Sequence, residues 1–221
     1  MVIQPAIEGL LGLQVNAPEN AITLAPALPA DWDSIWIENI FMADARIHFA
    51  FNRDEEGSQY RFNTSTYRKI KVTFMPDLLE GIEISKLLLN GKEYPFTTFK
   101  NPQGVKLFVE FELTDEVLLR LDHRHGISVL PVISDPAPGD SAAGLRIISA
   151  HLDGNQYRIH LEAPAGSIGL INVYIMDQAP VDVIGATLVG QGDNIYRYEV
   201  SFDETGSRYI SKEVIIKLKS G

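Results

Sequence analysis

The chain has 221 residues, 45% hydrophobic and 22% charged, which is the composition of a globular protein and not of a disordered one. Its 29 acidic and 19 basic side chains give a formal net charge of −10, which disfavours nucleic acid as a partner. Cysteine is absent, so disulfides, thiolate zinc sites and cysteine nucleophiles are excluded.

The first element, residues 1–13, is apolar and unlike the rest of the chain. Ile3, Ile7, Leu10 and Leu11 recur near helical spacing, and such an apolar helix needs a cover. We interpret it as the remnant of a preceding helical domain. It lacks the basic start of a secretory signal, and no run is long enough to span a membrane. We predict no membrane partner, and the sequence leaves the compartment open between cytoplasmic and periplasmic or extracellular.

A proline-containing stretch follows in AITLAPALPADWDSIWIEN, residues 21–39. Pro26 and Pro29 fix φ and favour an extended path, while Leu28 and Trp32 supply large apolar anchors. These features predict a connection that pins a helical body to a β domain with little loss of chain entropy.

The two tryptophans of this stretch also allow a different interpretation. Trp32 and Trp36 are candidate carbohydrate contacts, because exposed indole rings can stack on sugar rings. In the segment IWIEN, Trp36 shares a predicted strand face with Glu38, which is compatible with partial exposure of the indole. Buried aromatics are nevertheless the more common case.

From about residue 20 onward the hydrophobic period is two, which predicts half-buried strands in antiparallel sheets. Three segments carry the clearest alternation, RIHFAFN, KIKVTF and VKLFVEFEL. Their predicted inward side chains are Ile47, Phe49, Phe51, Ile70, Val72, Phe74, Leu107, Val109, Phe111 and Leu113.

Turn signals support the same fold class. Asn90-Gly91 and Asp153-Gly154 are typical of two-residue hairpin turns, and Gly57 is expected to close a longer hairpin loop. No long helical stripe follows residue 20. We predict an all-β protein.

The segment SDPAPGDSAAG, residues 134–144, has almost no large apolar side chain and reads as a linker. We therefore predict an antiparallel β-sandwich over residues 14–133 and a smaller immunoglobulin-like β-sandwich over residues 145–221. One continuous sandwich with an internal loop is the alternative.

The nearest pattern to a metal site is LDHRHG, with Asp122, His123 and His125. On a strand the two histidines would share a face, but no third ligand has convincing spacing. We favour a polar strand end and predict no metal site. His48 and the other strand histidines, His151 and His160, are read as isolated solvated side chains.

Carboxylates are numerous, and glycoside hydrolysis requires a pair of them. Asp31 and Asp33 flank Trp32, and a second group occupies a predicted hairpin tip, which favours a solvated turn. That tip group consists of Asp54, Glu55 and Glu56. The sequence contains no nucleophile elbow, P-loop or dinucleotide fingerprint. We assign no catalytic residue and predict no cofactor.

One set of positions resembles a known family. Gly9, Leu10 and Gly12 are followed by a pattern that is similar to the C-terminal junction of glycoside hydrolases and phosphorylases of the maltose-phosphorylase or glycogen-debranching type. The residues of that pattern are Leu24, Pro26, Leu28, Pro29 and Trp32. The resemblance covers residues 3–52. It implies a helical-barrel catalytic domain upstream, containing the acid and base, and a β-sandwich cap here.

The sequence as a whole predicts a non-catalytic C-terminal accessory region of a carbohydrate-active enzyme, which stabilises and orients the catalytic domain. The predicted partner is the upstream helical domain of the same polypeptide, with an oligosaccharide as a further candidate. Two alternatives stay open, an independent carbohydrate-binding module that uses exposed aromatics and a structural or adhesive cell-surface β protein.

Overall fold

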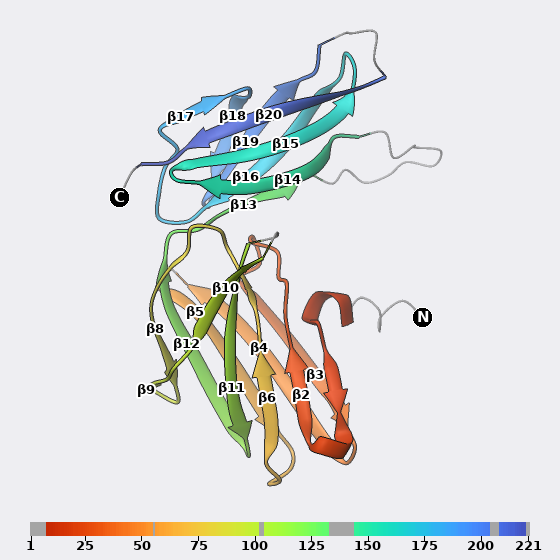
Figure 1. The fold of residues 1–221 in the computed structure, drawn as a ribbon, viewed down its shortest axis with the longest axis vertical. Helices are drawn as coiled ribbons and strands as arrows, with labels where there is room; N and C mark the ends of the chain where they lie inside the picture. Colours follow the sequence, from red (N-terminus) through yellow and green to blue (C-terminus); the bar gives the residue numbers. More distant parts are fainter. Residues whose placement is uncertain (1–7, 55, 102–103, 133–143, 204–207, 220–221) are drawn as a thin grey trace. The chain divides into compact units, whose positions relative to one another are not determined.

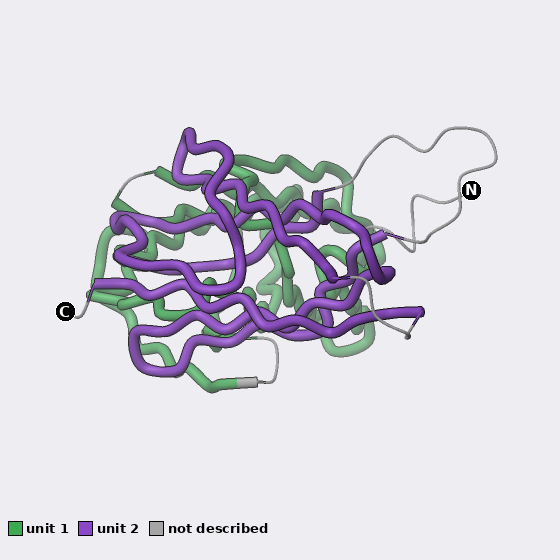
Figure 2. Tube along the Cα trace, turned by 90° about the horizontal axis from the view of Figure 1, so that it is seen from above, with its two compact units in different colours: residues 1–124 green, residues 125–221 purple. Residues whose placement is uncertain are grey.

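The computed structural model describes residues 8–54, 56–101, 104–132, 144–203 and 208–219. The chain divides into two compact units, residues 1–124 and 125–221 (Figure 2). Strands make up most of both units, so the all-β prediction is confirmed.

The first unit contains two sheets (Figure 1). One has the strand order β1-β2-β6-β11-β10, with β7 also paired to β11, and the other has the order β3-β4-β5-β12-β8-β9. The described elements are β1 (Gln14–Asn16), the 3-10 helix η1 (Ala17–Glu19), β2 (Ala21–Leu24), β3 (Ser34–Met42), β4 (Ala45–Asp54), β5 (Gly57–Thr64), β6 (Ile70–Phe74), β7 (Asp77–Leu78), β8 (Glu83–Leu89), β9 (Lys92–Glu93), β10 (Thr97–Asn101), β11 (Gly104–Leu113) and β12 (Glu116–Arg124).

The core of the first unit lies between these two sheets and contains all ten side chains that the alternation predicted to point inward. Aromatic rings from both sheets meet in it. The Phe49 ring lies 5.2 Å from the Phe62 ring and 6.1 Å from the Phe74 ring, between centroids. Such tilted pairs add to the stabilisation from burial. The unit is therefore a β-sandwich.

The proline-containing stretch connects the two sheets of this sandwich, because β2 belongs to one sheet and β3 to the other. The Pro26 carbonyl accepts a hydrogen bond from the Asp77 amide at 2.9 Å. Arg53 Nη1 donates to the Ala30 carbonyl at 2.6 Å, and Leu28 packs against the core. The stretch is thus anchored to the chain's own sandwich on both sides.

The N-terminal segment differs in part from the expectation. Residues 8–11 form a helical turn, and Leu11 is fully buried in the core of the sandwich. The carbonyls of Leu10 and Leu11 accept hydrogen bonds from the amides of Ala27 and Ala25, at 2.9 and 2.8 Å. This chain's own sheets therefore cover Leu11, and Leu10 is half-buried. Ile3 and Ile7 lie outside the described residues.

The second unit is a smaller sandwich of two four-stranded sheets, with the orders β13-β16-β19-β18 and β14-β15-β20-β17. Side chains from both sheets form one core, including Tyr157, Ile159, Val173 and Tyr198. Its described strands are β13 (Ile127–Pro131), β14 (Arg146–Asp153), β15 (Gln156–Pro164), β16 (Ile168–Ile175), β17 (Asp182–Ile184), β18 (Thr187–Gly192), β19 (Ile195–Ser201) and β20 (Tyr209–Lys217).

Two hairpin predictions have different outcomes. Asn90 and Gly91 have φ values of 50° and 78°, as the predicted turn requires. The second turn is shifted by one residue, because Asp153 pairs with Gln156 and the turn residues are Gly154 and Asn155. This register keeps the inward side chains of β15 in the core.

The division between the units lies at Arg124 and His125, ahead of the predicted linker at 134–144. The reason is that β13, which directly follows this point, pairs with β16 of the second unit. Residues 127–131 thus belong to the second sandwich and not to the first. All of the predicted linker except Gly144 lies outside the described residues.

Candidate functional site

The side chains of β3, β4 and β5 alternate between the core and solvent, so one surface of this sheet faces away from the sandwich. Trp36 on β3 is paired with Ala50 on β4, which is paired with Arg61 on β5. The next row joins Ser34, Asn52 and Gln59 in the same way. We call this surface the Trp36 face, and its members are Ser34, Trp36, His48, Ala50, Asn52, Gln59, Arg61 and Asn63.

Trp36 is the most exposed tryptophan, with 80% of its surface accessible to solvent. It lies on β3, an edge strand of the sheet. Its partner across the ladder is Ala50, whose methyl group is too small to cover an indole ring. A flat aromatic surface is therefore open to solvent on this strand.

Amide side chains lie next to this aromatic surface. Asn52 and Gln59 are directly opposite each other on β4 and β5, and Asn63 is opposite His48. Asn52 is exposed, and the other two amides are half-exposed. Each amide offers two N–H donors and a carbonyl acceptor. The Trp36 face thus combines an aromatic plane with several neutral hydrogen-bonding groups.

The edge strand β3 also has an irregularity. The ladder register shifts between Ile37 and Ile40, and Asn39 has a φ of 60°. Such a bulge re-aims side chains and discourages another strand from pairing at the edge. Beyond it, Phe41 is 66% exposed, and the Arg46 guanidinium lies 5.7 Å from its ring centroid.

The second predicted contact, Trp32, lies elsewhere. It precedes β3 in a turn in which its amide donates to the Pro29 carbonyl at 3.1 Å, and it is 40% exposed. The structure does not bring it onto the strand that carries Trp36. Asp31 and Asp33, which flank it, are exposed.

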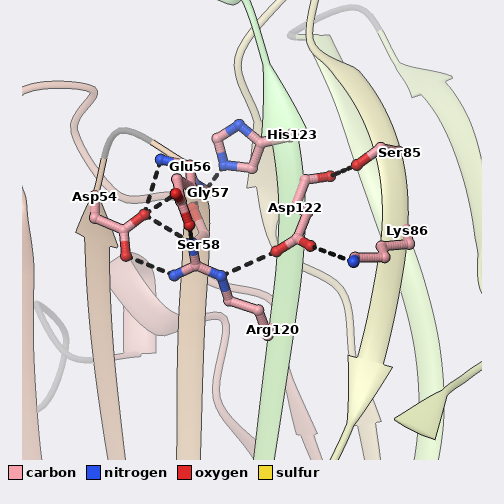
Figure 3. Close-up of polar contacts among 9 residues, drawn as sticks. All are labelled: Asp54, Glu56, Gly57, Ser58, Ser85, Lys86, Arg120, Asp122 and His123. Atoms are coloured by element: carbon pink, nitrogen blue, oxygen red, sulfur yellow. Dashed lines mark hydrogen bonds and ion pairs between the residues drawn. The ribbon is translucent and has the colours of Figure 1, made fainter. Parts of the chain in front are cut away.

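A cluster of ion pairs joins the end of β4 to the C-terminal half of β12 (Figure 3). The Arg120 guanidinium, 17% exposed, meets both Asp54 oxygens at 2.6 and 2.8 Å and one Asp122 oxygen at 3.0 Å. Lys86 reaches the other Asp122 oxygen at 3.2 Å. The hydrogen bonds from Arg120 hold the pKa of Asp54 below its ordinary value, and they raise the pKa of Arg120.

The hairpin tip between β4 and β5 is therefore more than a solvated turn. Asp54 Oδ1 accepts hydrogen bonds from the Glu56 and Gly57 amides, at 2.9 and 3.0 Å. Gly57 lies so close to β12 that a side chain there would collide with the Leu121 carbonyl. Glu55 lies outside the described residues. Asp54 therefore has a structural role, since it fixes the turn and binds Arg120.

The two histidines of LDHRHG do not share a strand face. His123 is the buried one, 2% exposed, and its Nε2 lies 2.9 Å from the Ser58 hydroxyl, which is also buried. His125 follows the end of β12 and has a φ of 59°. Because the chain leaves the strand between them, the alternation that placed both on one face does not hold. The described residues contain no group of three or more His, Asp or Glu able to hold a metal ion.

The histidines of the second unit are not isolated. His151 and His160 lie on neighbouring strands with their rings nearly parallel and 6.2 Å apart. His160 Nε2 is 3.3 Å from a Glu213 oxygen, and Arg158 reaches the other oxygen at 3.2 Å. This is a paired polar surface that the sequence pattern alone did not predict, because it depends on strand register.

No protein-family model matches the chain, and no curated protein matches it either. Within the described part of the chain, no helix has the length and hydropathy needed to cross a membrane.

Proposed function

We propose that this chain is a non-catalytic accessory region of a carbohydrate-active enzyme, of the glycoside hydrolase type with a helical-barrel catalytic domain. In this proposal the first sandwich stabilises and orients that domain, and the second unit is an added immunoglobulin-like module. Catalytic groups belong to the preceding domain. The proposal starts from the resemblance of the junction between Gly9 and Trp32.

The observation that carries the proposal is the way in which the N-terminal helical turn joins the sandwich. Two backbone hydrogen bonds and the buried Leu11 side chain hold the turn in place. A helix that continues into this turn would enter the sandwich at a fixed angle, because hydrogen bonds and burial restrict its pivot. A domain that orients a second domain requires such a fixed angle at the connection between them.

The apolar residues of the junction pattern support the same role. Leu24 is fully buried, and Leu28 packs against the core. These side chains anchor the stretch to the sandwich. Trp32 keeps 40% of its surface exposed and is available to a neighbouring domain. A tryptophan that becomes buried when two domains meet often carries much of the energy of their interface.

Immunopurification of the native polypeptide tests the proposal. An antibody against this chain should capture a polypeptide much larger than the 24.5 kDa of the 221 residues, with hydrolytic or phosphorolytic activity on oligosaccharides. A captured polypeptide of 24.5 kDa without such activity would refute the proposal.

A variant of that polypeptide tests the orienting role itself. Trp32→Ala should reduce the thermal stability of the activity and leave KM nearly unchanged, because the residue contacts a domain and not the substrate. Tyr67→Ala is the matched control, since Tyr67 is 94% exposed and lies in the loop after β5. An unchanged thermal stability for Trp32→Ala, equal to that of the control, would count against the role.

A further inference from the structure

We infer that the Trp36 face binds an uncharged oligosaccharide whose sugar rings carry mainly equatorial hydroxyl groups. This inference goes beyond the accessory role, because it assigns a ligand to a surface that the orienting function does not use. Three independent features support this inference. They are the exposed indole of Trp36, the amide side chains beside it, and the ion pairs that the nearby arginines already form with carboxylates of this chain.

The aromatic plane suits a sugar ring with equatorial hydroxyls. Such a ring directs its axial C–H bonds to its two faces, so each face is apolar and can pack flat on an indole. Trp36 is 80% exposed, and Ala50 beside it leaves space for a ligand over β4. An indole that projects from a strand presents a large, rigid contact area at low cost in conformational entropy.

The amides suit the hydroxyl groups at the edge of the same sugar. Asn52 and Gln59 donate and accept at once, which matches the dual character of a hydroxyl group. Adjacent strands are about 4.8 Å apart, so β4 and β5 place these amides about 5 and 10 Å from β3. That range corresponds to a ligand of two or three sugar units lying across the strands.

The charges near the face favour an uncharged ligand over an acidic one. The Arg61 guanidinium is 3.9 Å from a Glu116 carboxylate, and Arg120 is bound by Asp54 and Asp122. The basic groups nearest to the amides thus already have acidic partners. The chain as a whole carries a formal net charge of −10, which repels anionic glycans.

Calorimetric titration of the 221-residue chain tests the inference, with maltohexaose and cellohexaose as uncharged probes and an oligogalacturonate as the acidic comparator. We expect saturable binding of at least one uncharged probe with a Kd of about 1 mM or tighter. No saturable binding of either uncharged probe, or tighter binding of the acidic comparator, would overturn the inference.

Variants of the face make the test specific. Trp36→Ala should weaken binding by about tenfold or more, and Asn52→Ala and Gln59→Ala by smaller factors. Exposed residues such as these tolerate substitution, and a circular dichroism spectrum checks that each variant folds. Tyr67→Ala removes an even more exposed aromatic side chain outside the face and should leave binding unchanged. Binding that survives Trp36→Ala, or that falls equally in Tyr67→Ala, would overturn the inference.

This experiment and the immunopurification fail independently. If the chain binds no glycan but the native polypeptide is large and active, only the proposed Trp36 site is refuted. If the chain binds a glycan but the native polypeptide has a mass of 24.5 kDa, only the accessory role is refuted. The chain is then an independent carbohydrate-binding module.

Discussion

Arg120 on β12 and Asp54 at the end of β4 form a two-pronged ion pair, with both carboxylate oxygens within 2.8 Å of the guanidinium. The strand between them, β5, pairs with both β4 and β12. The pair therefore clamps three strands at one end of the sheet. Its planar geometry suits arginine and not lysine.

Replacing Arg120 should destabilise the first unit. Arg120→Met leaves Asp54 and Asp122 without their shared cation, and we expect the free energy of unfolding to fall by about 1–3 kcal/mol. Arg120→Lys keeps the charge but loses the forked hydrogen bonds, so a smaller loss is expected. Urea denaturation followed by fluorescence measures both, and equal stability of Arg120→Met and the natural chain would contradict the clamp.

The same pair predicts a dependence on pH. Because the pKa of Asp54 is held below 3.8, its ionised form stabilises the fold above about pH 4, and this contribution disappears as pH falls through the folded pKa. The stability difference between the natural chain and Asp54→Asn should therefore shrink below pH 4. Asp31→Asn removes the same formal charge at a position without an ion pair among the described residues and serves as the control. A difference that stays constant with pH would argue against the prediction.

Leu11→Ala tests how firmly the N-terminal turn belongs to the sandwich. Leu11 is fully buried in the core, and truncation of such a leucine costs about 2–5 kcal/mol. Val15→Ala, at a site 42% exposed, is the control and should change stability by less than about 0.5 kcal/mol. Equal effects of the two substitutions in thermal denaturation would show that the turn is not part of the folded unit.

The two separate cores predict two unfolding transitions. The buried side chains of the described residues fall into one cluster in each unit. Phe62→Ala should lower the stability of one transition by about 3–5 kcal/mol, and Leu161→Ala that of the other by about 2–5 kcal/mol. Differential scanning calorimetry measures both. A single transition that shifts with either substitution would indicate that the units unfold together.

Tyr198→Phe should be neutral or stabilising by up to about 1 kcal/mol, which is unusual for a core substitution. Its buried hydroxyl has no hydrogen-bond partner among the described residues, so removing it removes a desolvation cost. Chemical denaturation at pH 7 measures the change. A loss of more than about 1 kcal/mol would mean that the hydroxyl has an important partner.

The same substitution should alter alkaline unfolding. Burial raises the pKa of Tyr198 to about 12, so the folded chain keeps this proton while the unfolded chain loses it near pH 10. The free energy of unfolding thus falls as pH rises between about 10 and 12. Tyr198→Phe should reduce that slope.

The alternation of side chains was enough to predict the fold class and the inward faces of β4, β6 and β11. It was not enough for features that depend on contacts distant in sequence. His123 follows the inward alternation of β12, but its partner Ser58 is 65 residues away in the sequence, and the alternation does not reveal that contact. The exposure of Trp36 follows from the position of β3 at an edge, which periodicity does not reveal. The position of the amides beside Trp36 could not be predicted either, because it depends on which residues of β3, β4 and β5 pair with one another.

The parallel pairing of β2 with β6 places Leu24 beside Phe74 in the completed sandwich. The strands β3, β4 and β5, which belong to the opposite sheet, lie between them in sequence. During synthesis, β2 can pair with β1 early, but its pairing with β6 can form only after β6 has left the ribosome. Closing a loop of this length is slow compared with forming a hairpin, so the β2–β6 pairing forms late in the folding of this unit.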